Sequence, residues 1–191
     1  MTGGSSDSGR VDRRLAELGL HLPPPPRPRG AYAGVVVHAG IAHVSGQVSR
    51  LGDEVIAGPM QDGFPPVLAA RAAQACVLNA LSTLKAGLGG LDAVDRILHL
   101  RGFVNAVPDF DGHSRLLDQV SQRLQDIFGE RGRHARSAVG ASSLPGGGLL
   151  EIELTVALAP DFAPDFARID RSLGGAGGGA GESAGEGPGS G

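Results

Sequence analysis

The stretch ARSAVGASSLPGGGLLEIELTVAL, residues 135–158, is the most strongly patterned part of this 191-residue chain. Apolar side chains occupy every second position near its end: Leu150, Ile152, Leu154, Val156 and Leu158. Because successive side chains of a strand point to opposite faces, residues 149–158 are predicted to form a strand with one apolar and one polar face. Residues 135–141 predict another strand, and the glycines at 146–148 predict a hairpin loop that pairs the two.

Upstream of this stretch, apolar periodicity predicts two long helices and three further strands. The strands are expected at residues 32–38, 41–48 and 94–104. The helices are expected at 67–88 and 111–128, where large apolar residues recur at helical spacing. The order β-β-α-β-α-β-β predicts an α+β domain in which both helices cover one face of a mixed sheet. The other face has no cover of its own, which suggests self-association.

The two ends of the chain differ in composition from this domain, which we place at residues 30–160. Residues 1–10 and the glycine-rich end of the 161–191 extension carry too few apolar side chains to offset about 1–2 kcal/mol of backbone entropy per residue, which predicts disorder. Residues 11–29 predict a short helix and a proline-rich lead-in. We favour a rigid strut over a proline-rich ligand for a partner, because the prolines directly precede a strand pattern.

The composition excludes several classes of protein. The single cysteine, Cys76, excludes a disulfide framework, and its alanine-rich surroundings indicate packing rather than catalysis. The six histidines lack zinc-binding spacing, so no metal is expected. A net charge of −3 and a pI of about 6.0 give no footprint for nucleic acid. No apolar run approaches the roughly 20 residues of a membrane span, and no signal peptide is recognisable, so we expect a cytoplasmic protein.

One pair of residues carries a chemical signal. Arg136 lies among small residues in a predicted strand, and Glu151 lies on the polar face of the expected neighbouring strand. An arginine fork fits a carboxylate with two parallel hydrogen bonds, and a glutamate can hold a water molecule and move a proton. The alternative is a surface ion pair across the hairpin, which contributes only about 0–1 kcal/mol.

From about residue 30 to residue 159 the sequence resembles the Rid family, the reactive intermediate deaminases also called YjgF-like proteins. The resemblance rests on five segments in order: Gly30-Ala31-Tyr32, Val44-Ser45-Gly46-Gln47, the helix around Arg71–Leu81, Phe103-Val104 with Asp109-Phe110, and Arg136-Ser137 followed by Leu144-Pro145 and Glu151-Ile152-Glu153. It implies a chorismate-mutase-like fold and a homotrimer with clefts between subunits. It also implies hydrolysis of 2-aminoacrylate and related enamine or imine acids to 2-keto acids and ammonia, without a cofactor.

The same resemblance implies roles for individual residues. Arg136 matches the arginine that binds the substrate carboxylate, and Glu151 matches the glutamate that positions the hydrolytic water. Further binding positions are Tyr32, Ser45, Ser114, His134 and Ala138, the last through its backbone N–H. Ser114 stands where typical members have asparagine, which affects the substrate preference. His134 is expected on the same side of its strand as Arg136, either lining the cleft or exposed at its rim.

Other functions stay open at this point. The same clefts could belong to a non-catalytic trimer that binds a keto or amino acid and signals through a partner. They could also belong to a biosynthetic enzyme that cyclises or dehydrates an imine. A ribonuclease is disfavoured, because the chain is acidic and lacks basic patches interleaved with aromatic residues.

Overall fold

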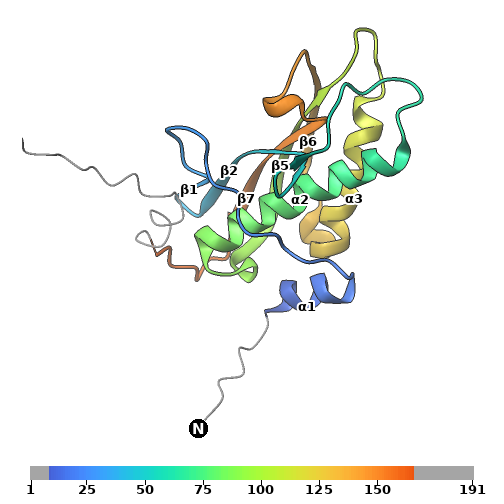
Figure 1. Cartoon of the computed structure of the whole chain (residues 1–191). Coiled ribbons are helices and arrows are strands. Elements are labelled where there is room, and N and C mark those ends of the chain that lie inside the picture. The colour runs from blue at the N-terminus through green and yellow to red at the C-terminus, as the bar shows by residue number, and fades with distance from the viewer. Residues whose placement is uncertain (1–8, 166–191) are drawn as a thin grey trace, which may run out of the picture.

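A five-stranded mixed sheet backs two long helices in the computed structural model, which describes residues 9–165 (Figure 1). The main strands are β1 (Val35–His38), β2 (Ile41–Val48), β5 (Val94–Asn105), β6 (Ala135–Ala141) and β7 (Leu150–Leu158). The helices are α1 (Arg10–Glu17), α2 (Pro66–Leu88) and α3 (His113–Phe128). Shorter elements are β3 (Arg50–Leu51), β4 (Glu54–Val55), η1 (Leu91–Ala93), η2 (Gly129–Gly132) and η3 (Pro145–Gly147).

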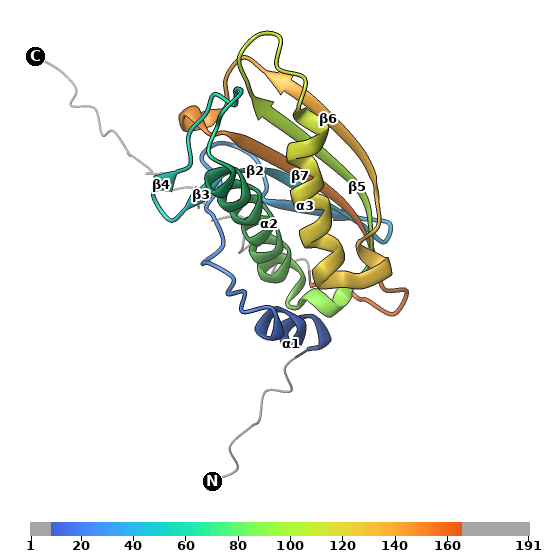
Figure 2. The ribbon, with the colours of Figure 1, turned by 90° about the vertical axis from the view of Figure 1, so that its right-hand side faces the viewer.

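The predicted α+β architecture is confirmed. Figure 2 shows α2 and α3 on the same face of the sheet. Strand β7 alternates as expected, with buried Leu150, Ile152 and Leu154 beneath the helices and half-buried Glu151 between them. The disorder predicted for residues 1–10 is wrong at its end, because Arg10 already begins α1; residues 1–8 and the glycine-rich tail lie outside the described residues.

The predicted hairpin between β6 and β7 is wrong. The strand order is β1-β2-β7-β5-β6, so β5 lies between them and pairs with both. Gly102 of β5 is the partner of Ala138 in the parallel β5–β6 ladder and of Ile152 in the antiparallel β5–β7 ladder. The connection over residues 142–149 is longer than the roughly two to five residues of a hairpin loop, and it passes the end of β5 instead.

Helix α2 forms the centre of the core. By length and composition it could cross a membrane, which corrects the expectation that no such apolar run exists. The stretch has polar residues within it, yet its many alanines and leucines raise the mean hydropathy. Of its most apolar window, 72% is buried inside the fold, so these side chains pack against the sheet and α3 rather than facing lipid.

The short helix predicted near the N-terminus is present as α1, and Val11 and Leu15 bury its apolar side. The segment that follows, residues 20–29, is called the lead-in below. It runs beside α2 without regular secondary structure toward β1 (Figure 2). Proline fixes φ and removes backbone donors, so this path needs few hydrogen-bonding partners.

Candidate functional site

A cavity of about 680 Å³ lies between the lead-in and the part of the sheet formed by β2 and β7. We call it the Glu151 cavity. Three of the residues predicted to form a site line it: Tyr32, Ser45 and Glu151. They come from the loop before β1, from β2 and from β7, so the fold brings together positions that are far apart in sequence.

A bulge in β2 makes room for the Glu151 carboxylate. Val44 pairs with Leu154 and Gln47 pairs with Ile152, so Ser45 and Gly46 together oppose a single residue of β7. A Cβ atom built on Gly46 would overlap Oε1 of Glu151. Glycine at position 46 is therefore what allows the carboxylate to occupy this notch.

The environment of Glu151 favours proton transfer. Burial raises the pKa of the Glu151 carboxyl above its usual value, and the negative charge of Glu153 raises it further. Shifting a carboxyl pKa toward neutrality brings it closer to the value at which a group both accepts and returns a proton efficiently. Glu151 is thus suited to act as a general base on a water molecule.

The other two predicted residues lie at the sides of this cavity. The Ser45 hydroxyl accepts a hydrogen bond from Nε2 of Gln47 at 3.4 Å, and the same amide nitrogen donates to the Ser45 carbonyl at 3.0 Å. Tyr32 is 51% exposed, and its hydroxyl oxygen accepts the backbone N–H of Arg29 at 3.4 Å. The only tyrosine of the chain therefore lies at the rim of the cavity, next to the lead-in.

Arg136 lies in a different place. Its Nη1 donates to Oδ1 of Asp118 at 2.8 Å and to Oγ of Ser121 at 3.1 Å, both on α3. These contacts hold one nitrogen of the guanidinium group. Its Nε and Nη2 have no hydrogen-bond partner among residues 9–165, and this edge has the geometry to bind a carboxylate with two hydrogen bonds.

His134 extends this group of side chains, which we call the Arg136 cluster (Asp118, Ser121, His134 and Arg136). Nδ1 of His134 is 2.6 Å from the Gly132 carbonyl, which can only accept, so Nδ1 carries the hydrogen. Nε2 is then left to accept from the Ser121 hydroxyl at 3.1 Å. Burial lowers the pKa of His134, which keeps the ring neutral beside the positive charge of Arg136.

The two remaining predicted residues lie near this cluster. Ala138 is half-buried on β6, an edge strand that pairs only with β5 within the described sheet. Ser114 is exposed in the first turn of α3. That turn packs closely on β6, because a Cβ atom added at Gly140 would come within 2.8 Å of Nε2 of His113.

The seven predicted residues therefore form two groups. Tyr32, Ser45 and Glu151 line the Glu151 cavity; Ser114, His134, Arg136 and Ala138 lie along β6 and α3. The surface ion pair between Arg136 and Glu151, the alternative interpretation of the sequence, does not form within the described residues. Strand β5 separates them, and Arg136 contacts the helix layer whereas Glu151 lies on the opposite face of the sheet.

Sequence reasoning missed several residues of both groups. Asp118 and Ser121 are three apart on the predicted helix, a spacing that places them on one polar side and could have marked them. Arg27, Arg29 and Arg50 line the Glu151 cavity. Nothing in their local pattern predicts this, because their place depends on where the lead-in docks.

The thiol of Cys76 lies behind the sheet rather than in either group. Its Sγ donates to the Leu150 carbonyl at 3.4 Å, and the side chain is fully buried. Burial raises the pKa of this thiol well above its usual value, and the charge of Glu151 adds to the effect. Such a thiol stays protonated, which agrees with the predicted packing role.

Comparisons with known proteins agree with this architecture. Residues 12–158 match the family described as "YjgF/chorismate mutase-like, putative endoribonuclease". Protein TCP17 from Trypanosoma cruzi is 37% identical over 155 residues, which are 79% of this chain and 96% of that protein. A protein of unknown function from Agrobacterium tumefaciens is 33% identical with a TM-score of 0.72, covering 78% of this chain and 93% of the other. A putative endoribonuclease from Shewanella oneidensis is 28% identical with a TM-score of 0.73, covering 78% and 99%.

Proposed function

Because the chain belongs to the YjgF/chorismate mutase-like family, we propose that it deaminates enamine and imine acids derived from amino acids, releasing ammonia and a 2-keto acid. The observation that carries this proposal is the Glu151 carboxylate, seated in the notch opposite Gly46 with its pKa raised by burial. Imines already react with water unaided. A positioned carboxylate that contributes about 10²–10⁴-fold is therefore sufficient catalysis, and it needs no covalent nucleophile.

The complete site in this proposal lies between two copies of the chain. Glu151 and Arg136 are on opposite faces of one sheet, so a small substrate cannot touch both within one chain. Arg136 lies on an edge strand, and the second face of the sheet is left uncovered by the described residues, with Val36 51% exposed. A closed ring of three copies in head-to-tail contact would bring the Arg136 cluster of each copy to the Glu151 cavity of the next.

In the proposed reaction an enamine substrate first tautomerises to the imine, and protons then move through Glu151 and through solvent. The free edge of Arg136 binds the substrate carboxylate while Glu151 takes a proton from water. The water oxygen attacks the imine carbon, the π electrons move to nitrogen, and the nitrogen takes a proton from solvent. In the resulting carbinolamine, Glu151 returns its proton to the nitrogen. The C–N bond then breaks, ammonia leaves, and the hydroxyl proton returns to solvent, which gives the keto acid.

A coupled assay tests this function. A serine dehydratase generates 2-aminoacrylate, and the rate of pyruvate formation from it is measured with and without the protein. We expect acceleration by the wild type and a loss of about 10²–10⁴-fold in Glu151→Gln. Glu130→Gln is the matched control, because Glu130 is exposed and contacts only Arg133 among the described residues. The proposal fails if the wild type gives no acceleration.

A further inference from the structure

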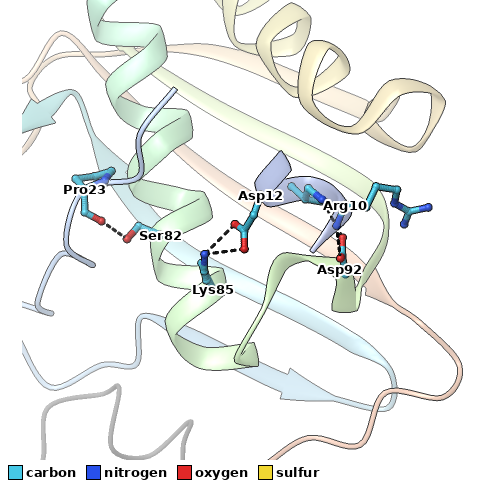
Figure 3. A network of polar contacts seen from close by, with 7 residues as sticks. Arg10, Asp12, Pro23, Ser82, Lys85 and Asp92 are labelled. Carbon is cyan, nitrogen blue, oxygen red and sulfur yellow. Dashed lines mark hydrogen bonds and ion pairs between the residues drawn. The ribbon is translucent and has the colours of Figure 1, made fainter. Parts of the chain in front are cut away.

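The lead-in forms one wall of the Glu151 cavity, and it is held at its start, through Pro23 and through the preceding helix α1. Nζ of Lys85 binds both carboxylate oxygens of Asp12 at 2.8 and 2.9 Å, and the Ser82 hydroxyl donates to the Pro23 carbonyl at 2.5 Å (Figure 3). At the start of α1, the Asp92 carboxylate accepts hydrogen bonds from the backbone N–H groups of Arg10 at 2.6 Å and of Val11 at 3.0 Å. These contacts tie the N-terminal segment to α2 and η1 at several points.

This wall brings positive charge to the cavity. Arg27 and Arg29 of the lead-in line it, together with Arg50 of β3. The backbone at Arg50 is itself fixed, because its carbonyl accepts Nδ2 of the buried Asn79 at 2.9 Å. None of the three guanidinium groups forms an ion pair with a residue between 9 and 165.

The charges of the cavity are therefore unbalanced. Its two acidic side chains are Asp53 and Glu151, against three arginines. Glu151 serves the reacting water in the proposed function, which leaves the arginines available for a ligand. A volume of about 680 Å³ also lies in the range that holds a drug-sized molecule, so a three-carbon acid would leave most of it empty.

We propose that the Glu151 cavity selects imine acids that carry a second carboxylate, bound by Arg27, Arg29 and Arg50. The substrate class is then the four- and five-carbon 2-imino dicarboxylic acids. Arg136 of a neighbouring copy binds the carboxylate next to the reacting carbon. Arg27, Arg29 and Arg50 bind the distal carboxylate. The catalytic part of this inference rests on the proposed function; the binding part does not.

Binding of stable keto acids tests the site without catalysis. Calorimetric titration of the full-length protein with 2-oxoglutarate and with 2-oxopentanoate compares two acids of equal chain length that differ in the second carboxylate. We expect the wild type to bind 2-oxoglutarate at least about tenfold more tightly. The triple variant Arg27→Gln, Arg29→Gln, Arg50→Gln should reduce this ratio to about one. Arg133→Gln is the matched control, since Arg133 lies outside the cavity in an exposed pair, and it should keep the wild-type ratio.

Turnover separates this inference from the proposed function. An amino acid oxidase produces the imines of glutamate and norvaline, and their rates of hydrolysis give a ratio of kcat/KM values. We expect a ratio of about ten or more in the wild type that falls toward one in the triple variant. If both imines are hydrolysed without preference, the dicarboxylate site is wrong and the deaminase stands. If neither is hydrolysed but the binding ratio and its loss are observed, the site stands and the deaminase is wrong. A wild-type binding ratio near one, or one that survives in the triple variant, overturns the site.

Discussion

Replacing Gly46 with alanine tests the geometry of the Glu151 cavity most directly. The added methyl group would occupy the position of Oε1 of Glu151, and it would also crowd the carboxyl carbon. The contact is with the end of a flexible side chain rather than with backbone, so the carboxylate can swing out of the notch. Gly46→Ala should therefore displace Glu151 while leaving the sheet in place.

The expected magnitudes for activity and stability differ sharply. Loss of a positioned general base should lower kcat/KM by about 10²–10⁴-fold, as in Glu151→Gln. Stability should change by only about 1 kcal/mol, because alanine gains roughly 0.5–1 kcal/mol over glycine in a strand and this offsets part of the crowding. A carboxylate displaced toward water also loses part of its burial. Its raised pKa should then fall back toward the ordinary value of 4.5.

Three measurements on one preparation check this reasoning. They are the coupled pyruvate assay, thermal unfolding, and an NMR titration of the Glu151 carboxyl. Gly90→Ala is the matched control, because a Cβ atom at Gly90 meets no other atom within 4 Å and its backbone is extended. The reasoning is refuted if Gly46→Ala keeps most of the activity, or if the pKa of Glu151 stays raised.

Three further substitutions give independent outcomes. Glu151→Gln should be more stable than the wild type above about pH 5. The pKa of Glu151 is raised in the folded state, so its carboxyl stabilises the fold below the unfolded-state pKa of 4.5 and loses that contribution as pH rises. Unfolding at pH 4 and pH 8 should therefore show the difference only at pH 8. Ser49→Ala should cost about 1–3 kcal/mol in urea unfolding, because the fully buried hydroxyl accepts two backbone N–H groups at 3.0 and 3.2 Å and donates to the Ile56 carbonyl; an unchanged midpoint contradicts this. Asp118→Asn weakens the contact that orients Arg136, so KM for the imine acid should rise more than kcat falls, and equal effects on both would argue against an orienting role.

The sequence predicted the helices and strands themselves far better than the order of the strands in the sheet. Alternation in residues 150–158 and helical spacing in 67–88 report which side of an element is buried, and those predictions agree with β7 and α2. Neither pattern reports which strand lies beside which. The sequence therefore did not predict that β5 lies between β6 and β7. For the same reason it did not predict that Arg136 and Glu151 are separated by a strand.

The sequence predicted only part of the lining of the Glu151 cavity, because local patterns do not report which segments pack together. Tyr32 and Ser45 were found because the family resemblance marks them, and Glu151 also because it lies on the polar face of a predicted strand. The arginine-bearing wall was not, because the prolines at 23–28 indicate an extended path but not the surface on which it docks. That surface includes Ser82 of α2, which binds the Pro23 carbonyl, while Lys85 one turn later holds α1 through Asp12.

The separation of Arg136 from Glu151 within one chain leads to a complementation experiment. Arg136→Gln and Glu151→Gln should each be inactive alone. If they are unfolded, mixed in equal amounts and refolded together, each site takes its arginine from one copy and its glutamate from the next. Random assembly then leaves about one quarter of sites with both residues intact, so about a quarter of wild-type activity should return. A site contained in one chain would return none, since every chain in the mixture lacks one residue. Activity that stays at the level of the separate variants would therefore contradict an intersubunit site while leaving the role of Glu151 untouched.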